Sequence, residues 1–254
     1  MKYYEKMLAM GCFSLQEVTQ LTGNSETARS ICKAYLKKGY IERIKRDFYT
    51  AISLETGQSV ANRFVIASHI NDSAIVSYHS AFEYYGYANQ VFYEVQVTSE
   101  SRFQDFDYDG LHYRRIMPQI KGGVTKEGGV RVTTLERTVI DCIHMFEKVG
   151  GGLEEFLRCI ALIPMLKEDT LLACLAEYNN GYLYQKTGCI LSQYASELGL
   201  ADTFFEECKK HLPKGKSYFF ERTSDFTFHE NWQIYAPADF SRITNKGVYD
   251  YDAI

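Results

Sequence analysis

The sequence predicts an α+β fold in which a small helical N-terminal domain over residues 1–55, the head, precedes a larger mixed α/β domain over residues 56–254, the body. Apolar residues recur at helical spacing through the head, whereas strand-like stretches flank a long helical block in the body. Charge divides the chain in the same way. Residues 1–51 carry nine Lys and Arg against five Asp and Glu, a net charge of +4, and the remainder carries 19 against 27, a net charge of −8. This contrast indicates that only the head faces a polyanion.

Composition excludes several classes of protein. The chain has 254 residues, of which 46% are hydrophobic and 15% aromatic, so a packed core is expected and disorder is not. Apolar runs are too short for a membrane span, and no signal peptide is expected, so we predict a cytoplasmic protein without membrane contact. The seven cysteines are scattered without a C-x-x-C pair, which predicts free thiols and no structural zinc. No metal and no cofactor are expected.

The first two helices of the head are short and end at glycines. A helix over residues 2–10 is expected to end at Gly11, and Ser14 is expected as the N-cap of a second helix that ends at Gly23. The glycine turn after the second helix sets up a helix-turn-helix with the segment that follows.

A third, longer helix begins after Asn24 or Ser25, either of which can cap it, and Gly39 closes it. One stripe of the helix is apolar and is expected to be buried: Ala28, Ile31, Cys32, Tyr35 and Leu36. The opposite face is polar and basic, which suits the major groove of DNA, although any solvated surface helix shows a similar face. The side chains expected to contact bases or phosphates here are Ser25, Thr27, Arg29, Ser30, Lys33 and Lys37.

Residues 40–51 read as a tight hairpin with a polar tip at Lys45, Arg46 and Asp47. A basic hairpin directly after such a helix is typical of the wing of a winged helix-turn-helix, which reaches the DNA backbone or the minor groove. Arg43, Lys45 and Arg46 are therefore added to the expected DNA contacts. Winged-helix modules that bind proteins are the alternative.

The body is expected to contain a mixed or antiparallel sheet. Residues 56–59 are expected to form a linker. The elements predicted after it are helices over residues 60–70 and 78–85, strands over 91–98, 111–117 and 128–134, a helical block over 135–211, and strands over 217–221 and 226–236.

The densest polar cluster of the body is TTLERTVIDC, residues 133–142. Thr133 or Thr134 can cap a helix, and Asp141 lies four residues after Arg137, within reach of an ion pair on one helix face. Two interpretations stay open: a capped helix with a structural ion pair, or a polar site that faces a partner. For the second interpretation the candidate residues are Glu136, Arg137 and Asp141.

Other motifs lack residues that their chemistry requires. The D-x-D-x-D-G at residues 105–110 starts like a calcium loop, but its twelfth position is Ile116 instead of a glutamate, so a solvated hairpin is expected. Gly150–Gly152 precede a helix without the Gly-Lys-Ser/Thr of a phosphate-binding loop. A winged-helix nuclease with Glu94 in its acidic strand would need a lysine where Gln96 stands. The chain is therefore expected not to be an enzyme. A ligand-sensing regulator is a further alternative, because the large aromatic body can hold a pocket.

Several segments, taken in order, resemble one known family. They are the G-Y-I-x-R hairpin from Gly39 to Tyr49, SYHSAFEYYGY at residues 77–87, an apolar strand ending at Thr98, VTTLERTVIDC at 132–142, a helix preceded by glycines, and the closing NKGVYDY. Together they resemble the AbiEi family of abortive-infection antitoxins, the antitoxin half of type IV toxin–antitoxin systems.

The resemblance implies two functions and no catalysis. The winged helix would repress the protein's own operon by binding double-stranded DNA at inverted repeats upstream. The C-terminal domain would counter a nucleotidyltransferase-like toxin without forming a stable complex with it. One departure is Asp47, which stands where the wing tip of the family often has a glycine, so a wider turn is expected there.

Overall fold

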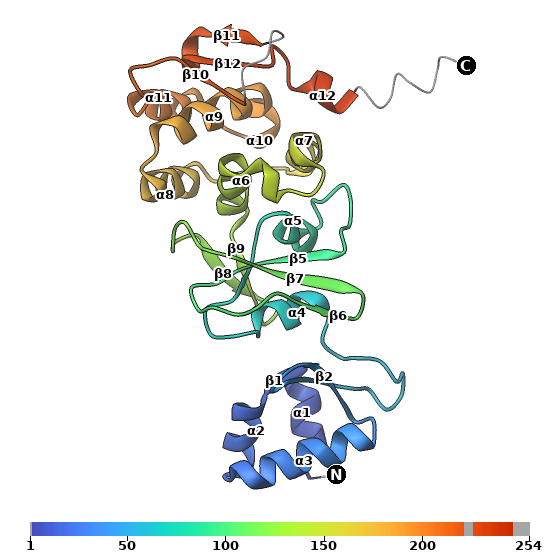
Figure 1. Ribbon diagram of the computed structural model, residues 1–254. Coiled ribbons are helices and arrows are strands. Elements are labelled where there is room, and N and C mark those ends of the chain that lie inside the picture. Colours follow the sequence, from blue (N-terminus) through green and yellow to red (C-terminus); the bar gives the residue numbers. More distant parts are fainter. Residues whose placement is uncertain (1, 221–225, 246–254) are drawn as a thin grey trace, which may run out of the picture. The chain divides into compact units, whose positions relative to one another are not determined.

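The computed structural model describes residues 2–220 and 226–245. Figure 1 shows the chain coloured by residue number. The chain divides into two compact units, which are described separately. Unit 1 comprises Met1–Val76, Tyr93–Pro118 and Lys126–Val132, and unit 2 comprises Ser77–Phe92, Gln119–Thr125 and Thr133–Ile254. The mixed α/β class expected from the sequence is confirmed, with helices and three separate sheets.

The head, in unit 1, packs three helices around a small antiparallel sheet of strand order β1-β3-β2. Its elements are α1 (Tyr4–Met10), β1 (Cys12–Ser14), α2 (Leu15–Thr22), α3 (Ser25–Lys37), β2 (Ile41–Lys45) and β3 (Phe48–Ala51). Their buried side chains form one core, which includes Met7, Phe13, Val18, Ala28, Cys32, Ile41 and Tyr49. The sequence did not predict β1, because three residues are too few to show the alternation of a strand.

The expected caps of the head are confirmed. Ser14 caps α2 in a capping box with Glu17, and Gly23 ends that helix in the left-handed conformation. Asn24, of the two candidates, caps α3 by accepting a hydrogen bond from the backbone N–H of Thr27 at 2.9 Å. The third helix therefore has its expected start, and the apolar stripe of α3 faces the core.

The hairpin has a tighter turn than expected. Lys45 pairs with Phe48, so only Arg46 and Asp47 form the turn, and Asp47 itself adopts the left-handed conformation at φ +58°. The expectation of a wider turn is wrong, because aspartate tolerates this conformation better than most residues. A bulge between Arg43 and Lys45 shifts the register, which lets both Ile41 and Ile44 be buried.

A six-stranded mixed sheet, largely in unit 1, has the order β6-β7-β5-β4-β9-β8. Its strands are β4 (Ile75–Val76), β5 (Glu94–Thr98), β6 (Phe106–Tyr108), β7 (Leu111–Ile116), β8 (Val124–Glu127) and β9 (Val130–Thr133). β5 runs parallel to β7 and β4 parallel to β9, whereas the pairs β4–β5 and β6–β7 are antiparallel. The hairpin expected over residues 105–110 is thus β6–β7, with its turn at Asp109 and Gly110.

The helix expected over residues 60–70 is shorter, α4 (Arg63–Ser68), with Asn62 as its N-cap. Residues 52–59 form a closed turn in which Ser59 pairs with Ile52, so the helix cannot begin earlier. The strand expected from residue 91 begins at Glu94.

Unit 2 is mainly helical. It contains α5 (His79–Tyr85), α6 (Leu135–His144), α7 (Gly152–Leu162), α8 (Glu168–Tyr178), α9 (Gly181–Leu191), α10 (Ala195–Leu198), α11 (Asp202–Lys210) and α12 (Ser241–Asn245), with short 3₁₀ turns at Phe146–Lys148, Ser192–Tyr194 and Glu230–Trp232. The helical block expected over residues 135–211 is confirmed. In α9 the residues from Leu183 to Leu191 are buried, and Gly188 lies against the indole of Trp232.

Unit 2 contains a small three-stranded sheet with the order β10-β12-β11. Its strands are β10 (Ser217–Tyr218), β11 (Thr227–His229) and β12 (Ile234–Ala236). The segment 226–236 was expected to be one strand, but the turn at residues 230–232 folds it into the antiparallel pair β11–β12. Residues 221–225 and the closing segment beyond Asn245, which were part of the sequence predictions, lie outside the described residues. In the described part of the chain, no helix is both long and apolar enough to span a membrane.

Candidate functional site

The polar face of α3 is exposed, as the sequence predicts. Asn24 caps the helix at its N-terminal end, and the buried stripe on the opposite side fixes which side chains face solvent. The exposed candidates are Ser25, Thr27, Arg29, Ser30, Lys33 and Lys37 on α3, and Arg43 and Arg46 on the hairpin.

Lys45 is placed differently from its expected position at the tip. It is the last residue of β2 and is half-buried, with its ammonium nitrogen 5.0 Å from the ring centre of Phe103 and 4.9 Å from that of Phe106. Burial lowers the pKa of Lys45. Arg46, by contrast, exposes 96% of its side chain and lies 3.7 Å from the carboxylate of Asp47. Lys45 therefore packs against aromatic rings of unit 1, and Arg46 is the cation at the tip.

A groove of about 400 Å³ runs between α3 and the hairpin. Arg29, Lys33 and Arg43 line it together with Asp47, and the apolar lining comes from Leu15, Cys32, Leu36 and Tyr49. The groove thus combines exposed cations with an apolar floor.

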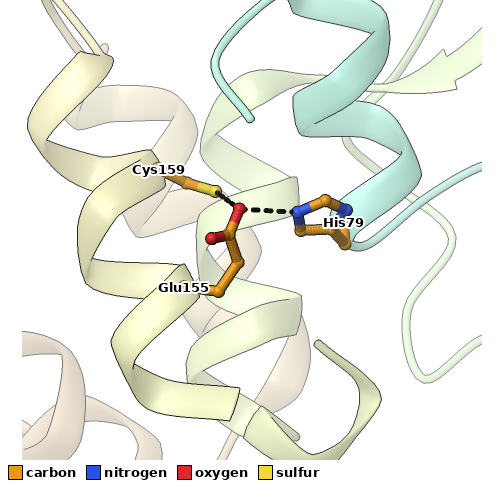
Figure 2. Close-up of side chains that lie close together, drawn as sticks. All are labelled: His79, Glu155 and Cys159. Carbon is orange, nitrogen blue, oxygen red and sulfur yellow. Dashed lines mark hydrogen bonds and ion pairs between the residues drawn. The ribbon is translucent and has the colours of Figure 1, made fainter. Parts of the chain in front are cut away.

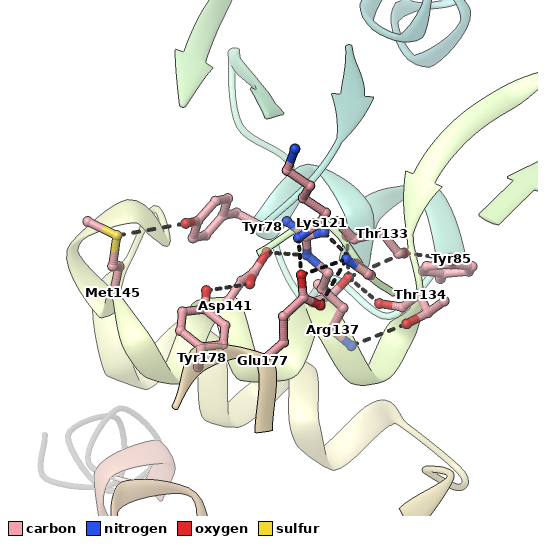
Figure 3. A network of polar contacts seen from close by, with 12 residues as sticks. Tyr78, Tyr85, Lys121, Thr133, Thr134, Arg137, Asp141, Met145, Glu177 and Tyr178 are labelled. Atoms are coloured by element: carbon pink, nitrogen blue, oxygen red, sulfur yellow. Dashed lines mark hydrogen bonds and ion pairs between the residues drawn. The ribbon is translucent and has the colours of Figure 1, made fainter. Parts of the chain in front are cut away.

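A second polar group surrounds α6 in unit 2 (Figure 3). Thr134 caps the helix by accepting from the backbone N–H of Arg137, whereas the hydroxyl of Thr133 lies 2.7 Å from that of Thr138. The predicted ion pair is present: Nε of Arg137 donates to Oδ2 of Asp141 at 3.2 Å. The capped helix with an i,i+4 ion pair is thereby confirmed.

The ion pair is buried. Arg137 and Asp141 are each 1% exposed, and the hydroxyl of Tyr178 donates to Oδ1 of Asp141 at 2.6 Å. Burial raises the pKa of Asp141, while the Arg137 guanidinium and the Tyr178 hydroxyl act in the opposite direction. The charges of this pair therefore balance one another inside the unit.

The same arginine holds a glycine loop that the sequence did not connect with it. Arg137 Nη1 donates to the carbonyl of Gly122 at 2.5 Å, and the carboxylate of Glu177 accepts from the backbone N–H groups of Lys121 and Gly122 at 2.6 and 3.0 Å. A Cβ at Gly122 would meet Glu177, and one at Gly123 would meet Arg137. Glycine is therefore required at Gly123, which has a φ of +63° and lies against the Cβ of Arg137, whereas a side chain at Gly122 would displace the Glu177 carboxylate.

The last member of the cluster, Glu136, is 7% exposed and accepts a hydrogen bond from the backbone N–H of Lys167 at 3.0 Å. All three candidates of residues 133–142 thus have partners within unit 2.

A third polar group, which the sequence analysis missed, joins α5 and α7 in unit 2 (Figure 2). The two ring nitrogens of His79 lie 3.1 Å from a carboxylate oxygen of Glu83 and 3.0 Å from one of Glu155. The imidazole ring thus bridges two glutamates that lie on different helices, α5 and α7. The i,i+4 spacing of His79 and Glu83 was the one signal in the sequence that could have shown part of this group.

Glu155 accepts further hydrogen bonds within this group. Glu155 also accepts from the backbone N–H groups of Asn89 and Gln90 at 3.1 and 2.9 Å, and from the thiol of Cys159 at 3.5 Å. Burial acts to raise the pKa of Glu155, but hydrogen bonds from His79 and Asn89 outweigh it, so this pKa lies below 4.5.

Ligand atoms of His79, Glu155 and Cys159 lie within 4.8 Å of one another, which is close enough to share a metal ion. Burial, however, raises the pKa of the Cys159 thiol to about 12, which disfavours the thiolate that a metal ion would need as a ligand. The donor set therefore fits a buried hydrogen-bonded group that links α5 to α7 better than a metal centre.

The residues of the nuclease alternative lie on β5. Gln96 is buried, and its side-chain N–H donates to Glu94 at 3.2 Å, while Arg114 lies 3.4 Å from the same glutamate. Asp105 and Asp107 accept from the backbone N–H of Arg115 and from the His112 ring, respectively. This arrangement offers no lysine at the position that such a nuclease requires.

Together, these features define a mixed α/β protein with an exposed basic helix in its head. No protein-family model and no curated protein matches the chain. Among solved structures, its fold is similar to the crystal structure of the Rv2827c protein from Mycobacterium tuberculosis, with a TM-score of 0.61 and 11% sequence identity over 91% of this chain and 88% of that chain. At this identity the likeness shows the fold alone.

Proposed function

We propose that the head is a winged helix-turn-helix that binds double-stranded DNA and that the chain represses its own operon. The observation that carries the proposal is the exposed face of α3, which presents Arg29, Lys33 and Lys37 beside a basic hairpin. The order helix, strand, two helices and hairpin is the order of a winged helix, with α3 as the recognition helix and β2–β3 as the wing.

The dimensions of α3 support this assignment. Its 13 residues give a length of about 20 Å, enough for two to three turns to lie in a major groove. Small side chains at its N-terminal end allow close approach to base edges, and the arginine and lysines behind them suit phosphates.

We further propose an antitoxin role for the rest of the chain, in the cytoplasm and without catalysis. This part rests on the resemblance to AbiEi antitoxins and implies opposition to a nucleotidyltransferase-like toxin without a stable complex. The candidate residues for this role are Glu136, Arg137 and Asp141. Glu136 and Arg137 form hydrogen bonds with backbone groups near α6, and Asp141 pairs with Arg137.

Two readouts on the full chain separate the two roles. The cells carry a reporter under the DNA upstream of the protein's own gene, and an inducible copy of the neighbouring gene, which is expected to encode the toxin. The wild type should repress the reporter and restore the growth that induction of the toxin stops. Arg29→Ala/Lys33→Ala should lose repression and keep the growth rescue. If this variant represses as the wild type does, the assignment of α3 is wrong; if the wild type never restores growth, the antitoxin role is wrong.

A ligand-sensing regulator is the second candidate, because unit 1 contains a pocket of about 480 Å³. Polar groups line it, including Glu42 of the wing strand and Tyr108, whose hydroxyl donates to Glu42 at 3.2 Å. A ligand there would contact the wing directly. Thermal shifts against a panel of metabolites test this candidate, and a ligand that stabilises the protein but not a Tyr108→Phe/Glu42→Gln variant would support it.

A further inference from the structure

The groove between α3 and the hairpin gathers three cations from two elements. Arg29 and Lys33 lie one turn apart on α3, and Arg43 faces them from β2. All three are exposed, and within residues 2–220 and 226–245 none of them forms an ion pair. Asp47, the one acid of the lining, is already paired with Arg46. The groove therefore has an excess of positive charge that the protein itself does not neutralise.

Arg43 is held in place before any ligand arrives. It pairs with Tyr49 across β2–β3, and its guanidinium carbon lies 5.8 Å from the centre of the Tyr49 ring. Tyr49 is 4% exposed, so the ring that supports the guanidinium is fixed by the core. The Tyr49 side chain also forms a hydrogen bond with Arg43, and the guanidinium, with its five N–H donors, has further donors for an anion.

The shape of the groove narrows the choice of anion. With a volume of about 400 Å³ it can hold a phosphate with part of its sugar, and its floor includes Leu15 and Leu36, which would lie against the sugar. The opening lies beside the exposed face of α3, along which a DNA strand would run if this helix occupied the major groove.

We propose that this groove seats one phosphodiester of the DNA backbone between Arg29, Lys33 and Arg43. The inference rests on the proposed DNA-binding function and adds to it a single fixed contact between the recognition helix and the wing. Such a contact carries no sequence information; it sets the register and orientation of α3 so that its N-terminal side chains meet the base edges.

The test combines DNA duplexes that each lack the charge of one phosphate with protein variants that each lack one side chain. Duplexes from the DNA upstream of the protein's gene carry one neutral methylphosphonate at each position in turn, and binding is measured by fluorescence anisotropy at fixed salt. At one position the substitution should weaken binding of the wild type by about tenfold, the loss expected for a charge-assisted contact. Arg43→Ala should bind the unmodified duplex about tenfold more weakly and should be nearly insensitive to the substitution at that position.

Lys6→Ala is the matched control, because Lys6 is an exposed cation on α1, away from the groove. It should keep the full sensitivity of the wild type at that position. If the wild type binds the duplex but every methylphosphonate affects wild type and Arg43→Ala equally, the phosphate seat is wrong while DNA binding stands. If the wild type binds no duplex, the proposed function fails and the seat fails with it.

Discussion

Replacing Arg137 by methionine tests whether the buried ion pair of α6 is a structural element of unit 2. Methionine keeps most of the aliphatic length and removes the charge. Asp141, 1% exposed, would then keep a carboxylate with Tyr178 as its remaining hydrogen-bond donor, and the carbonyl of Gly122 would lose its donor. Breaking a buried pair in this way costs about 3–5 kcal/mol of unfolding free energy.

The assay is equilibrium unfolding in urea, followed by the fluorescence of Trp232. This residue is the only tryptophan of the sequence and is buried in unit 2, so its signal reports on that unit. Asp141→Asn should also destabilise, but the double variant should cost about 2 kcal/mol less than the sum, because no unpaired charge then remains. The control Arg158→Met breaks the exposed i,i+4 pair with Glu154 and should cost less than about 0.5 kcal/mol. Additive losses, or a loss below about 1 kcal/mol for Arg137→Met, would contradict a structural ion pair.

Three further predictions follow from single positions. Gly188→Ala should destabilise unit 2 by more than about 2 kcal/mol in the same urea assay, because the added methyl group would meet the indole of Trp232. This loss outweighs the roughly 1 kcal/mol that alanine gains over glycine in helix propensity. A variant more stable than the wild type would refute the close packing of Gly188 and Trp232. Because the pKa of Glu155 is lowered in the folded protein, its carboxylate stabilises the fold above about pH 4.5, and this stabilisation is lost as the pH falls through the folded-state pKa. In urea titrations below pH 4.5, Glu155→Gln should therefore lose less unfolding free energy with falling pH than the wild type does. Parallel pH profiles of the two proteins would contradict this. Asp47→Asn should tighten DNA binding about two- to fivefold in anisotropy titrations, because it removes an anion from the groove. Asparagine also tolerates the left-handed backbone conformation of this position. Unchanged or weaker binding would count against the groove as a DNA contact.

Local signals explain why the caps of the helices in the head could be predicted. Ser14, Asn24 and Gly23 act on the residues next to them, so their capping roles can be read from sequence. The position of Lys45 could not be read in this way. It depends on a bulge in β2 and on the rings of Phe103 and Phe106, which lie far away along the chain.

The same distinction holds for the candidate sites of unit 2. The pairing of Arg137 with Asp141 follows from their spacing on one helix, and it was predicted. That Arg137 also holds the loop at Gly122 depends on tertiary packing, and the sequence shows only two adjacent glycines there. The hydrogen-bonded group of His79, Glu83 and Glu155 was missed for the same reason, since His79 and Glu155 lie 76 residues apart in the sequence.

Whether the head reads DNA is tested by measuring how the full chain binds the DNA upstream of its own gene, compared with random DNA, as the salt concentration is varied. With about four to six phosphate contacts, the slope of log affinity against log salt should be roughly −4 to −5. Arg29→Ala/Lys33→Ala should flatten it by about two units, and Lys6→Ala should leave it unchanged. Tight, sequence-selective binding with these slopes is the predicted result. Equal affinity for random DNA, or a slope that the α3 variant does not alter, would contradict a DNA-reading head.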